Sequence, residues 1–195
     1  MLGGTFDPPH LAHLVLAANA RHDLQLDEVV LVPAGEPYRK ADRAVTPPEI
    51  RLRMIRAAVA ELPWASVSAI ELERDGSTFT TDTLQELTTD GANWWFILGT
   101  DALTDLPHWK EPQRIAELVR FGLALRPRQI GQLEVPEATK DAVPGIEDRI
   151  DRVEMPLLDI SSTDLRARFG DGRPVEYLVT DPVRAVIDEL GLYAR

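Results

Sequence analysis

The stretch Trp94-Trp95-Phe96-Ile97-Leu98, followed by Gly99, carries the strongest strand signal in the chain. Aromatic and β-branched residues favour a strand, and glycine is a common point at which a strand ends. Three other runs have strand character, two apolar throughout and one alternating, and they cover residues 29–32, 121–125 and 67–72. Continuous apolar runs are typical of strands that are buried on both faces of a parallel sheet.

Helix signals lie between these runs. Thr46-Pro47-Pro48-Glu49 predicts a helix start with the threonine as N-cap, and apolar residues keep helical spacing over 50–59. Asp181-Pro182 predicts another helix with the aspartate as N-cap and the proline at the first position, and Gly191 ends that helix. Strands that alternate with helices predict an α/β fold, a Rossmann-like doubly wound parallel sheet with helices on both faces. Residues 129–152 show no clear pattern, and we expect a loop or a surface helix there.

Composition limits the classes of function. The 195 residues predict one domain, spanning 1–195, and the net charge of −11 disfavours nucleic acid or an anionic membrane as the main partner. Cysteine is absent, which excludes disulfides and thiol chemistry. No apolar run has the length of a membrane span, and Met1 leads directly into a Gly-Gly turn, so we expect a cytoplasmic protein. The composition leaves open whether the protein forms a homo-oligomer.

The first motif, from Gly3 to His13, has the sequence GGTFDPPHLAH. Its glycines let backbone N–H groups approach a ligand closely, and the apolar spacing that follows predicts a helix from about Pro9. His10 and His13 are three residues apart and share one side of the first turn, where a helix N-terminus attracts phosphate. The alternatives are a Gly-Pro turn with two surface histidines, or a zinc site, for which the usual third ligand is missing.

The second motif, from Asp159 to Arg166, has the sequence DISSTDLR. Three consecutive hydroxyl side chains at a helix start and an arginine one turn later predict a second anion-binding site. In the simpler interpretation, Ser161 or Ser162 caps a helix and Arg166 is solvated.

Both motifs resemble those of bacterial nicotinate-nucleotide adenylyltransferases, in the nucleotidyltransferase superfamily named after HxGH. The resemblance implies a set of ATP-binding residues, which are Gly3, Gly4, Thr5, Phe6, His10, His13, Ser161, Ser162, Thr163 and Arg166. Among these, it implies catalytic roles for His10, His13 and Arg166. This chain departs from the family pattern at Ala12, where the family has glycine, and only Met1 and Leu2 precede the first motif.

Three segments between the motifs extend the resemblance. Ser77–Thr83 is similar to the family's SYTxDT segment, which implies that Thr80 lies by the nicotinate carboxylate. Gly99-Thr100-Asp101 resembles its GxD segment and implies that Asp101 faces the nucleotide ribose, while Trp109 matches a tryptophan that stacks on the pyridine ring. Basic family positions match Lys40, a substrate-binding candidate, and Arg51. Without the resemblance, the segment 77–83 would be interpreted as a turn before a helix and Trp109 as a partly buried core residue. Lys40 and Arg51 would be interpreted as solvated surface charges.

The implied reaction is adenylyl transfer from ATP to nicotinate mononucleotide, giving deamido-NAD and pyrophosphate in NAD biosynthesis. Its nucleophile is a phosphate that is already anionic, so catalysis needs alignment and charge neutralisation rather than a protein nucleophile. Mg²⁺ is expected on the triphosphate of ATP, held mainly by phosphate and water. The alternatives are another acceptor, such as nicotinamide mononucleotide, FMN or phosphopantetheine, or a non-catalytic nucleotide-binding homologue. The pantetheine enzymes have Thr-Asn-Gly-His where this chain has His-Leu-Ala-His.

Overall fold

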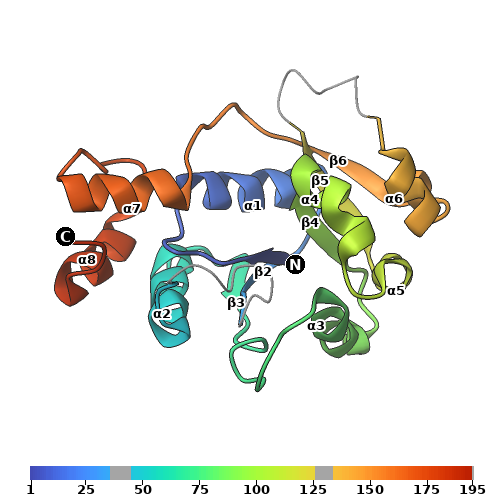
Figure 1. Ribbon diagram of the computed structural model, residues 1–195, viewed down its shortest axis with the longest axis horizontal. Coiled ribbons are helices and arrows are strands. Elements are labelled where there is room, and N and C mark those ends of the chain that lie inside the picture. The colour runs from blue at the N-terminus through green and yellow to red at the C-terminus, as the bar shows by residue number, and fades with distance from the viewer. Residues whose placement is uncertain (36–44, 126–133, 195) are drawn as a thin grey trace.

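A six-stranded, all-parallel sheet forms the centre of the computed structural model, which describes residues 1–35, 45–125 and 134–194 (Figure 1). The strand order is β3-β2-β1-β4-β5-β6. The strands are β1 (Leu2–Gly4), β2 (Val29–Pro33), β3 (Ala65–Val67), β4 (Trp95–Gly99), β5 (Arg120–Leu125) and β6 (Ile150–Glu154). This is the strand order of a doubly wound α/β fold, as the sequence predicts.

Helices cover both faces of the sheet. One face is covered by α1 (Leu11–Asp23) and α2 (Pro48–Val59). The other is covered by α3 (Thr80–Leu87), α4 (Thr100–Asp105), α5 (Pro112–Leu118) and α6 (Glu137–Ala142), with the short 3₁₀ helices η1 (Thr88–Asp90), η2 (Leu106–His108) and η4 (Ile146–Arg149). A third apolar cluster joins α2 to α7 (Ser162–Asp171) and α8 (Asp181–Leu190). None of the helices in the described ranges is long and apolar enough to cross a membrane.

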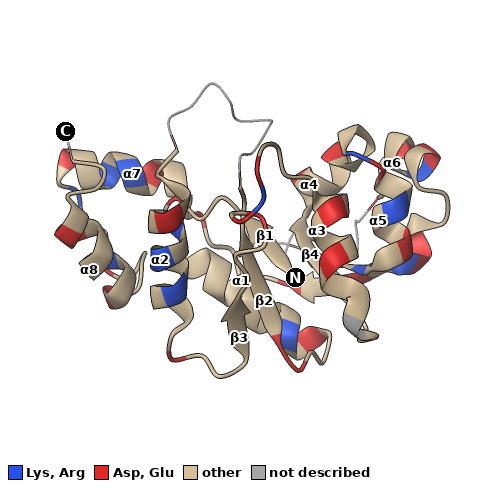
Figure 2. Ribbon diagram, turned by 90° about the horizontal axis from the view of Figure 1, so that it is seen from below, with Lys and Arg blue, Asp and Glu red and all other residues tan. Residues whose placement is uncertain are grey.

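The alternation of side chains along the strands explains their apolar sequence. In β4, Phe96 and Leu98 pack into the cluster under α3 to α5, whereas Ile97 packs into the cluster under α1 and α2. Figure 2 shows β1, β2 and β3 free of charged residues, while charges gather on the surrounding helices. Burial on both faces therefore requires the continuous apolar runs from which the sheet was predicted.

Two predicted starts and one predicted strand are wrong in detail. The N-cap of α2 is Pro47 rather than Thr46, whose carbonyl instead accepts the Arg51 Nε–H at 2.9 Å, and the N-cap of α8 is Thr180. The expected strand 67–72 is shifted, since β3 ends at Val67. Beyond it, the N–H groups of Leu72 and Glu73 both donate to the Ala69 carbonyl, so the backbone turns instead of extending.

The strand β6 begins at Ile150, inside the segment 129–152 where a loop or a surface helix was expected, and continues to Glu154. Its sequence lacks an apolar pattern because its polar groups are paired across the sheet. Asp151 accepts two hydrogen bonds from the Arg120 guanidinium, at 2.7 and 2.8 Å, and a third from Trp95 Nε1 at 2.7 Å. A charged residue thus occupies a strand position that periodicity alone assigns to a surface segment.

The sheet divides between β1 and β4, and this division positions the site. The two strands pair in register only at Leu2 and Ile97, and their carboxyl ends lead into Thr5 and Thr100, in opposite winding directions. In open parallel sheets, ligands bind in the crevice outside the carboxyl ends at such a switch point. Both the first motif and the Gly99-Thr100-Asp101 segment begin there.

Candidate active site

The turn after β1 holds its shape through a buried aromatic ring. Phe6 is 1% exposed and has a φ of 51°, in the left-handed region that bulky residues rarely adopt. A Cβ on Gly4 would lie 3.0 Å from the Phe6 ring, so glycine leaves the space that the ring fills. The cost of this backbone conformation, on the order of 1–3 kcal/mol, is typical of functional turns held by their surroundings. The buried ring therefore fixes the backbone conformation of this turn, which lies at the crevice between β1 and β4.

The two histidines of the first motif stack at the start of α1. Their ring centroids are 3.8 Å apart, and the His10 backbone N–H donates to His13 Nδ1 at 3.2 Å. Because His13 Nδ1 accepts this bond, the proton of the neutral ring lies on Nε2, which is then a donor. Burial lowers the pKa of His10 to about 4, and burial together with the charge of His10 lowers the pKa of His13 to about 3. His10 is 7% exposed, so the surface-histidine alternative is wrong.

These pKa values predict an acid-sensitive fold. Unfolded histidines take up protons near pH 6.5, whereas the folded ones do so only near pH 4 or below, so acidification through this window favours the unfolded state. We expect the melting temperature of the wild type to fall more steeply between pH 7 and pH 4 than that of a His10→Asn/His13→Asn variant. The exposed His22→Asn control should follow the wild type, and parallel curves for all three proteins would contradict the pKa assignment.

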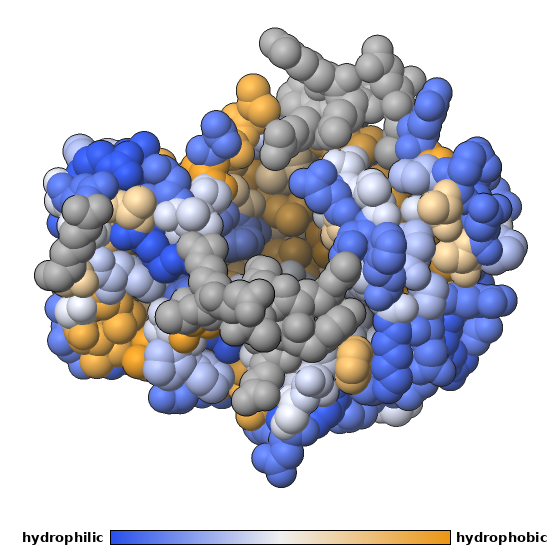
Figure 3. Space-filling model, viewed as in Figure 1, coloured by the Kyte–Doolittle hydropathy of each residue, from blue (hydrophilic) through white to orange (hydrophobic). Residues whose placement is uncertain are grey.

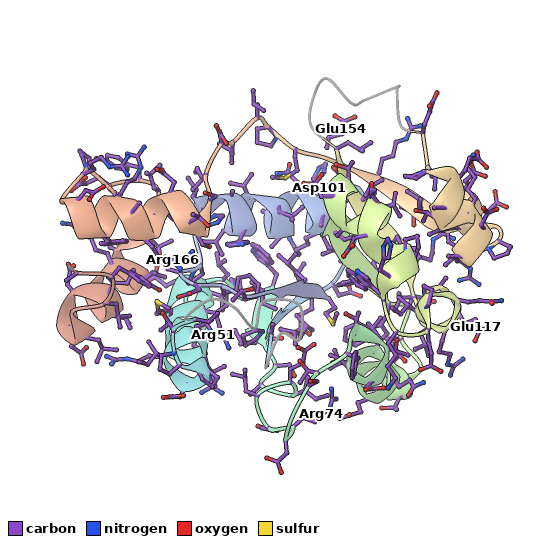
Figure 4. The ribbon with its side chains drawn as sticks, in the orientation of Figure 1. Arg51, Arg74, Asp101, Glu117, Glu154 and Arg166 are labelled. Atoms are coloured by element: carbon purple, nitrogen blue, oxygen red, sulfur yellow. The ribbon has the colours of Figure 1, made fainter. Side chains whose placement is uncertain are left out.

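The second motif meets the first where two helix N-termini face each other. Figure 1 shows α1 and α7 nearly in line, and the Ser162 hydroxyl donates to the Pro8 carbonyl at 2.9 Å. Arg166 extends from α7 toward α2 (Figure 4), donates to the Asp7 carbonyl, and donates to Thr163 Oγ1 at 3.3 Å. Its side chain is 18% exposed, so the solvated alternative is wrong. Ser161 caps α7 by accepting the Asp164 N–H at 3.2 Å.

Residues of the first motif line three adjoining cavities. The first, of about 280 Å³, is lined among others by Gly3, Gly4, Thr5, Thr80, Trp109 and Lys110. The second, of about 160 Å³, is lined by Thr5, Phe6, Asp7, His13, Val45, Ser162, Thr163 and Arg166. The third, of about 240 Å³, is lined among others by His10, Ala12, His13, Gly99, Thr100 and Asp101. Thr5 is common to the first two cavities and His13 to the last two, so together they form one elongated site, and Figure 3 shows this face hollowed with hydrophobic residues at the bottom.

The first cavity has a rigid aromatic wall. Trp109 Nε1 donates to Asp105 Oδ2 at 3.1 Å, and the Trp109 ring packs 5.8 Å from the Phe96 ring. The buried Thr81 hydroxyl donates to the Lys110 carbonyl at 2.5 Å and so ties the start of α3 to the segment after the tryptophan. The orientation of the indole is therefore set from two sides. Lys40, the remaining candidate, lies outside the described residues.

Arg51 is a buried residue for which the sequence predicted only a match to a basic position of the family, with a solvated charge as the alternative. It is 2% exposed, and its guanidinium donates to the carbonyls of Thr46 and Thr5, both at 2.9 Å, and of Gly35 at 3.4 Å. These bonds tie the turn after β1 to the end of β2 and the start of α2. The interpretation of Arg51 as a solvated charge is wrong, because the helical apolar spacing around it does not reveal which polar position faces inward.

Glu71 is a second residue that the sequence analysis missed. Its carboxylate accepts the Gly35 N–H at 3.2 Å and the hydroxyls of Thr78 at 3.1 Å and Thr83 at 2.9 Å. It therefore connects the loop after β2 to the segment that carries Thr80. An isolated glutamate near a turn carries no sequence signal for such a role.

Comparisons with known proteins give matches over most or all of the chain. The family described as cytidylyltransferase-like matches residues 1–168. A probable nicotinate-nucleotide adenylyltransferase from Roseiflexus sp. is 45% identical over 194 residues, covering 99% of this chain and 96% of its own. One of the same name from Exiguobacterium sibiricum is 40% identical over 196 residues, covering 100% and 97%.

Solved structures show the same fold at lower identity. Nicotinic acid mononucleotide adenylyltransferase from Plasmodium falciparum, complexed with NaAD, superposes with a TM-score of 0.71 at 20% identity, covering 98% of this chain and 95% of that chain. The same protein complexed with APC gives a TM-score of 0.70. On the strength of the closely similar sequences over its whole length, the chain belongs to the nicotinate-nucleotide adenylyltransferase family of cytidylyltransferase-like proteins.

Proposed function

We propose that this protein transfers the adenylyl group of ATP to nicotinate mononucleotide, releasing pyrophosphate and forming deamido-NAD. The carrying observation is that the first motif lines three adjoining cavities, which match an acceptor, a triphosphate and a nucleoside in order. Thr5 and His13 each line two of the cavities, and we place the α-phosphate near them, where the acceptor phosphate can approach it opposite the leaving pyrophosphate. ATP is the co-substrate, and we place the reaction in the cytoplasm, where ATP is available.

In this proposal, the middle cavity binds the triphosphate. His13 offers the Nε2–H donor, Arg166 offers a planar cation, and the two helix N-termini direct their free N–H groups and dipoles at the same space. The attacking oxygen belongs to the 5′-phosphate of the mononucleotide, and the bond that breaks joins the α-phosphorus to the bridging oxygen of pyrophosphate. Catalysis then consists of in-line alignment and donors that meet the growing charge of the leaving group.

The histidines serve as hydrogen-bond donors rather than fixed cations. With pKa values of about 4 and 3, both imidazoles are neutral near pH 7 in the free protein. A bound polyphosphate favours the charged form and raises these pKa values, so positive charge can build up as the substrate binds. Arg166 supplies the permanent charge, which compensates locally for a chain whose net charge is −11.

A divalent cation, Mg²⁺ in this proposal, would accompany ATP. Among the residues that the structure describes, no group of three His, Asp or Glu side chains could hold a metal. A cation carried by phosphate oxygens and water fits this donor set, with the Ser162 and Thr163 hydroxyls beside it in the middle cavity. When bound, it would neutralise charge on the leaving pyrophosphate.

The first cavity provides the acceptor site. Trp109 presents a fixed ring plane on which a flat pyridinium can stack, and the N-terminus of α3, beginning at Thr80, presents N–H groups for the carboxylate. In the third cavity, Asp101 offers a carboxylate to ribose hydroxyls, and Ala12 lines the same wall. Nicotinamide mononucleotide is the second candidate acceptor, since the aromatic wall suits both rings.

The test of the proposed function is pyrophosphate release with ATP and each acceptor separately. Nicotinate mononucleotide should support turnover, whereas FMN and phosphopantetheine should not. Release with none of the acceptors would overturn the proposal in favour of a non-catalytic nucleotide-binding protein.

Replacing Arg166 should weaken ATP far more than the mononucleotide. An arginine bond to a charged phosphate contributes about 1.5–3 kcal/mol, so Arg166→Ala should weaken ATP affinity by about 10- to 100-fold. Calorimetry with each ligand measures the two affinities. Arg168→Ala, which removes an arginine from the same helix that pairs with Asp164 instead, is the matched control and should change neither. Equal weakening of both ligands by Arg166→Ala would assign the residue a structural role.

A further inference from the structure

A buried carboxylate lies beside the proposed triphosphate cavity without contributing to anion binding. Asp7 is 3% exposed and lines the middle cavity. A negative charge at this place repels phosphate and requires compensation, because an unpaired buried charge is costly. The mechanism proposed above assigns no role to this carboxylate or to the residues that compensate it.

The compensation comes from three segments that are far apart in the sequence. Tyr193, beyond α8, donates its hydroxyl proton to Asp7 Oδ1 at 2.7 Å. The Thr46 N–H donates to Asp7 Oδ2 at 3.4 Å, and the Thr46 hydroxyl donates to the Tyr193 oxygen at 3.4 Å. The Arg166 guanidinium lies 3.7 Å from Asp7 Oδ2. The Arg51 guanidinium also attracts the Asp7 carboxylate. Asp7 is therefore stabilised by a phenol on one side and by the Arg166 guanidinium on the other, with Arg51 as a further cation.

We infer that Tyr193 is a positioning residue for ATP, which acts through Asp7 to hold the Arg166 guanidinium at the triphosphate cavity. This inference rests on the proposed function of that cavity. By occupying Oδ1, the phenol limits the pull of the carboxylate on Arg166. Without the phenol, the carboxylate loses one hydrogen bond and draws the guanidinium closer and away from the phosphates.

The surroundings of Tyr193 support a role as a donor. Burial raises the pKa of its hydroxyl above the ordinary value, so the phenol keeps its proton and donates it throughout the physiological range. The Tyr193 ring packs with Phe169 of α7, with a centroid distance of 5.9 Å, and with the apolar cluster around Met54. Because the ring is held by apolar contacts and the hydroxyl by polar ones, the two contributions can be separated by removing the oxygen alone.

Tyr193→Phe tests the inference. We expect the KM for ATP to rise by about five- to tenfold, because the phenol acts on ATP only indirectly and the effect is on the scale of one ordinary hydrogen bond, while the KM for nicotinate mononucleotide stays within about twofold. The melting temperature should fall modestly, since the ring stays in place while the buried carboxylate loses one hydrogen bond. Tyr177→Phe is the matched control, because that side chain is 90% exposed, and it should leave both KM values unchanged.

A double-mutant cycle with Arg166 tests whether Tyr193 affects ATP binding through Arg166. If Tyr193 acts through Arg166, the ATP effect of Tyr193→Phe should largely disappear in the Arg166→Ala background. An equal loss in both backgrounds, an equal rise of both KM values, or no rise at all would overturn the inference.

Calorimetric ATP affinity, measured without any acceptor, separates this result from the fate of the proposed reaction. If the wild type binds ATP but turns over no acceptor, the proposed function fails. The effect of Tyr193→Phe on ATP binding still decides the inference.

Discussion

His13→Ala should lower kcat by about 10²- to 10³-fold, the loss typical of removing one donor that meets developing charge. His13 lines both the middle and the third cavity, which we propose hold the triphosphate and the nucleoside, and its Nδ1 is occupied by the His10 backbone N–H. Its Nε2–H is thus oriented before substrate arrives, so no reorganisation is needed during the reaction. Removing it takes away an interaction that strengthens as charge moves onto the leaving pyrophosphate.

The measurement is steady-state pyrophosphate release at saturating ATP and nicotinate mononucleotide, together with thermal unfolding. His13 makes an edge contact with the Phe6 ring, at a centroid distance of 4.9 Å, so a modest loss of stability is expected and should be reported beside kcat. His22→Ala, which removes a histidine from the last turn of the same helix with a side chain that is 84% exposed, is the matched control. Near-normal turnover of folded His13→Ala would remove His13 from the mechanism.

Nicotinate mononucleotide should be preferred over nicotinamide mononucleotide by about 100-fold or more in kcat/KM. The two acceptors have the same shape and differ in charge, so discrimination depends on donors placed at one group. The net charge of −11 gives no general attraction for an anion, and the Lys110 ammonium beside the cavity is paired with Asp82 at 2.9 Å. Among the described residues, the candidate donors are the backbone N–H groups around Thr80, at the start of α3, and those that follow Trp109.

Neutral donors suit this discrimination. They form charge-assisted hydrogen bonds with a carboxylate, about twice as strong as bonds to a neutral acceptor. A carboxamide would turn its own NH₂ toward one of these N–H groups and leave both donors unpaired, which adds a desolvation penalty. The hydrogen bond from Thr81 to the Lys110 carbonyl fixes the start of α3 against the segment after Trp109, so the donors cannot easily rearrange.

Competition between the two acceptors at equal concentration measures this preference directly. Trp109→Ala should weaken both acceptors while ATP affinity stays nearly unchanged, and Trp109→Phe should restore much of the loss by keeping a flat ring. A preference for the amide would overturn the acceptor assignment and leave adenylyl transfer standing. Loss of ATP affinity in Trp109→Ala would contradict the division of the site into separate cavities.

The sequence by itself determined the fold class and the two motifs. Apolar strands such as 94–98 are readable because burial on both faces of a parallel sheet demands continuous hydrophobicity. The first motif is readable because a tight turn, a close backbone approach and a helix start each require particular residues at fixed spacing. The resemblance of both motifs to the adenylyltransferases then gave the family, which the comparisons confirm. The roles of the site residues stay predictions.

Tertiary structure decided which polar residues pair with partners from distant segments. Asp151 in β6, Arg51 in α2 and Tyr193 beyond α8 look like ordinary surface residues in the sequence, yet each satisfies groups contributed by distant segments. A polar side chain is buried when partners from other elements compensate its desolvation, and those partners are separated here by 31 to 186 positions. No local pattern encodes such a pairing, because it arises only when the sheet brings the strand ends and the helix N-termini together.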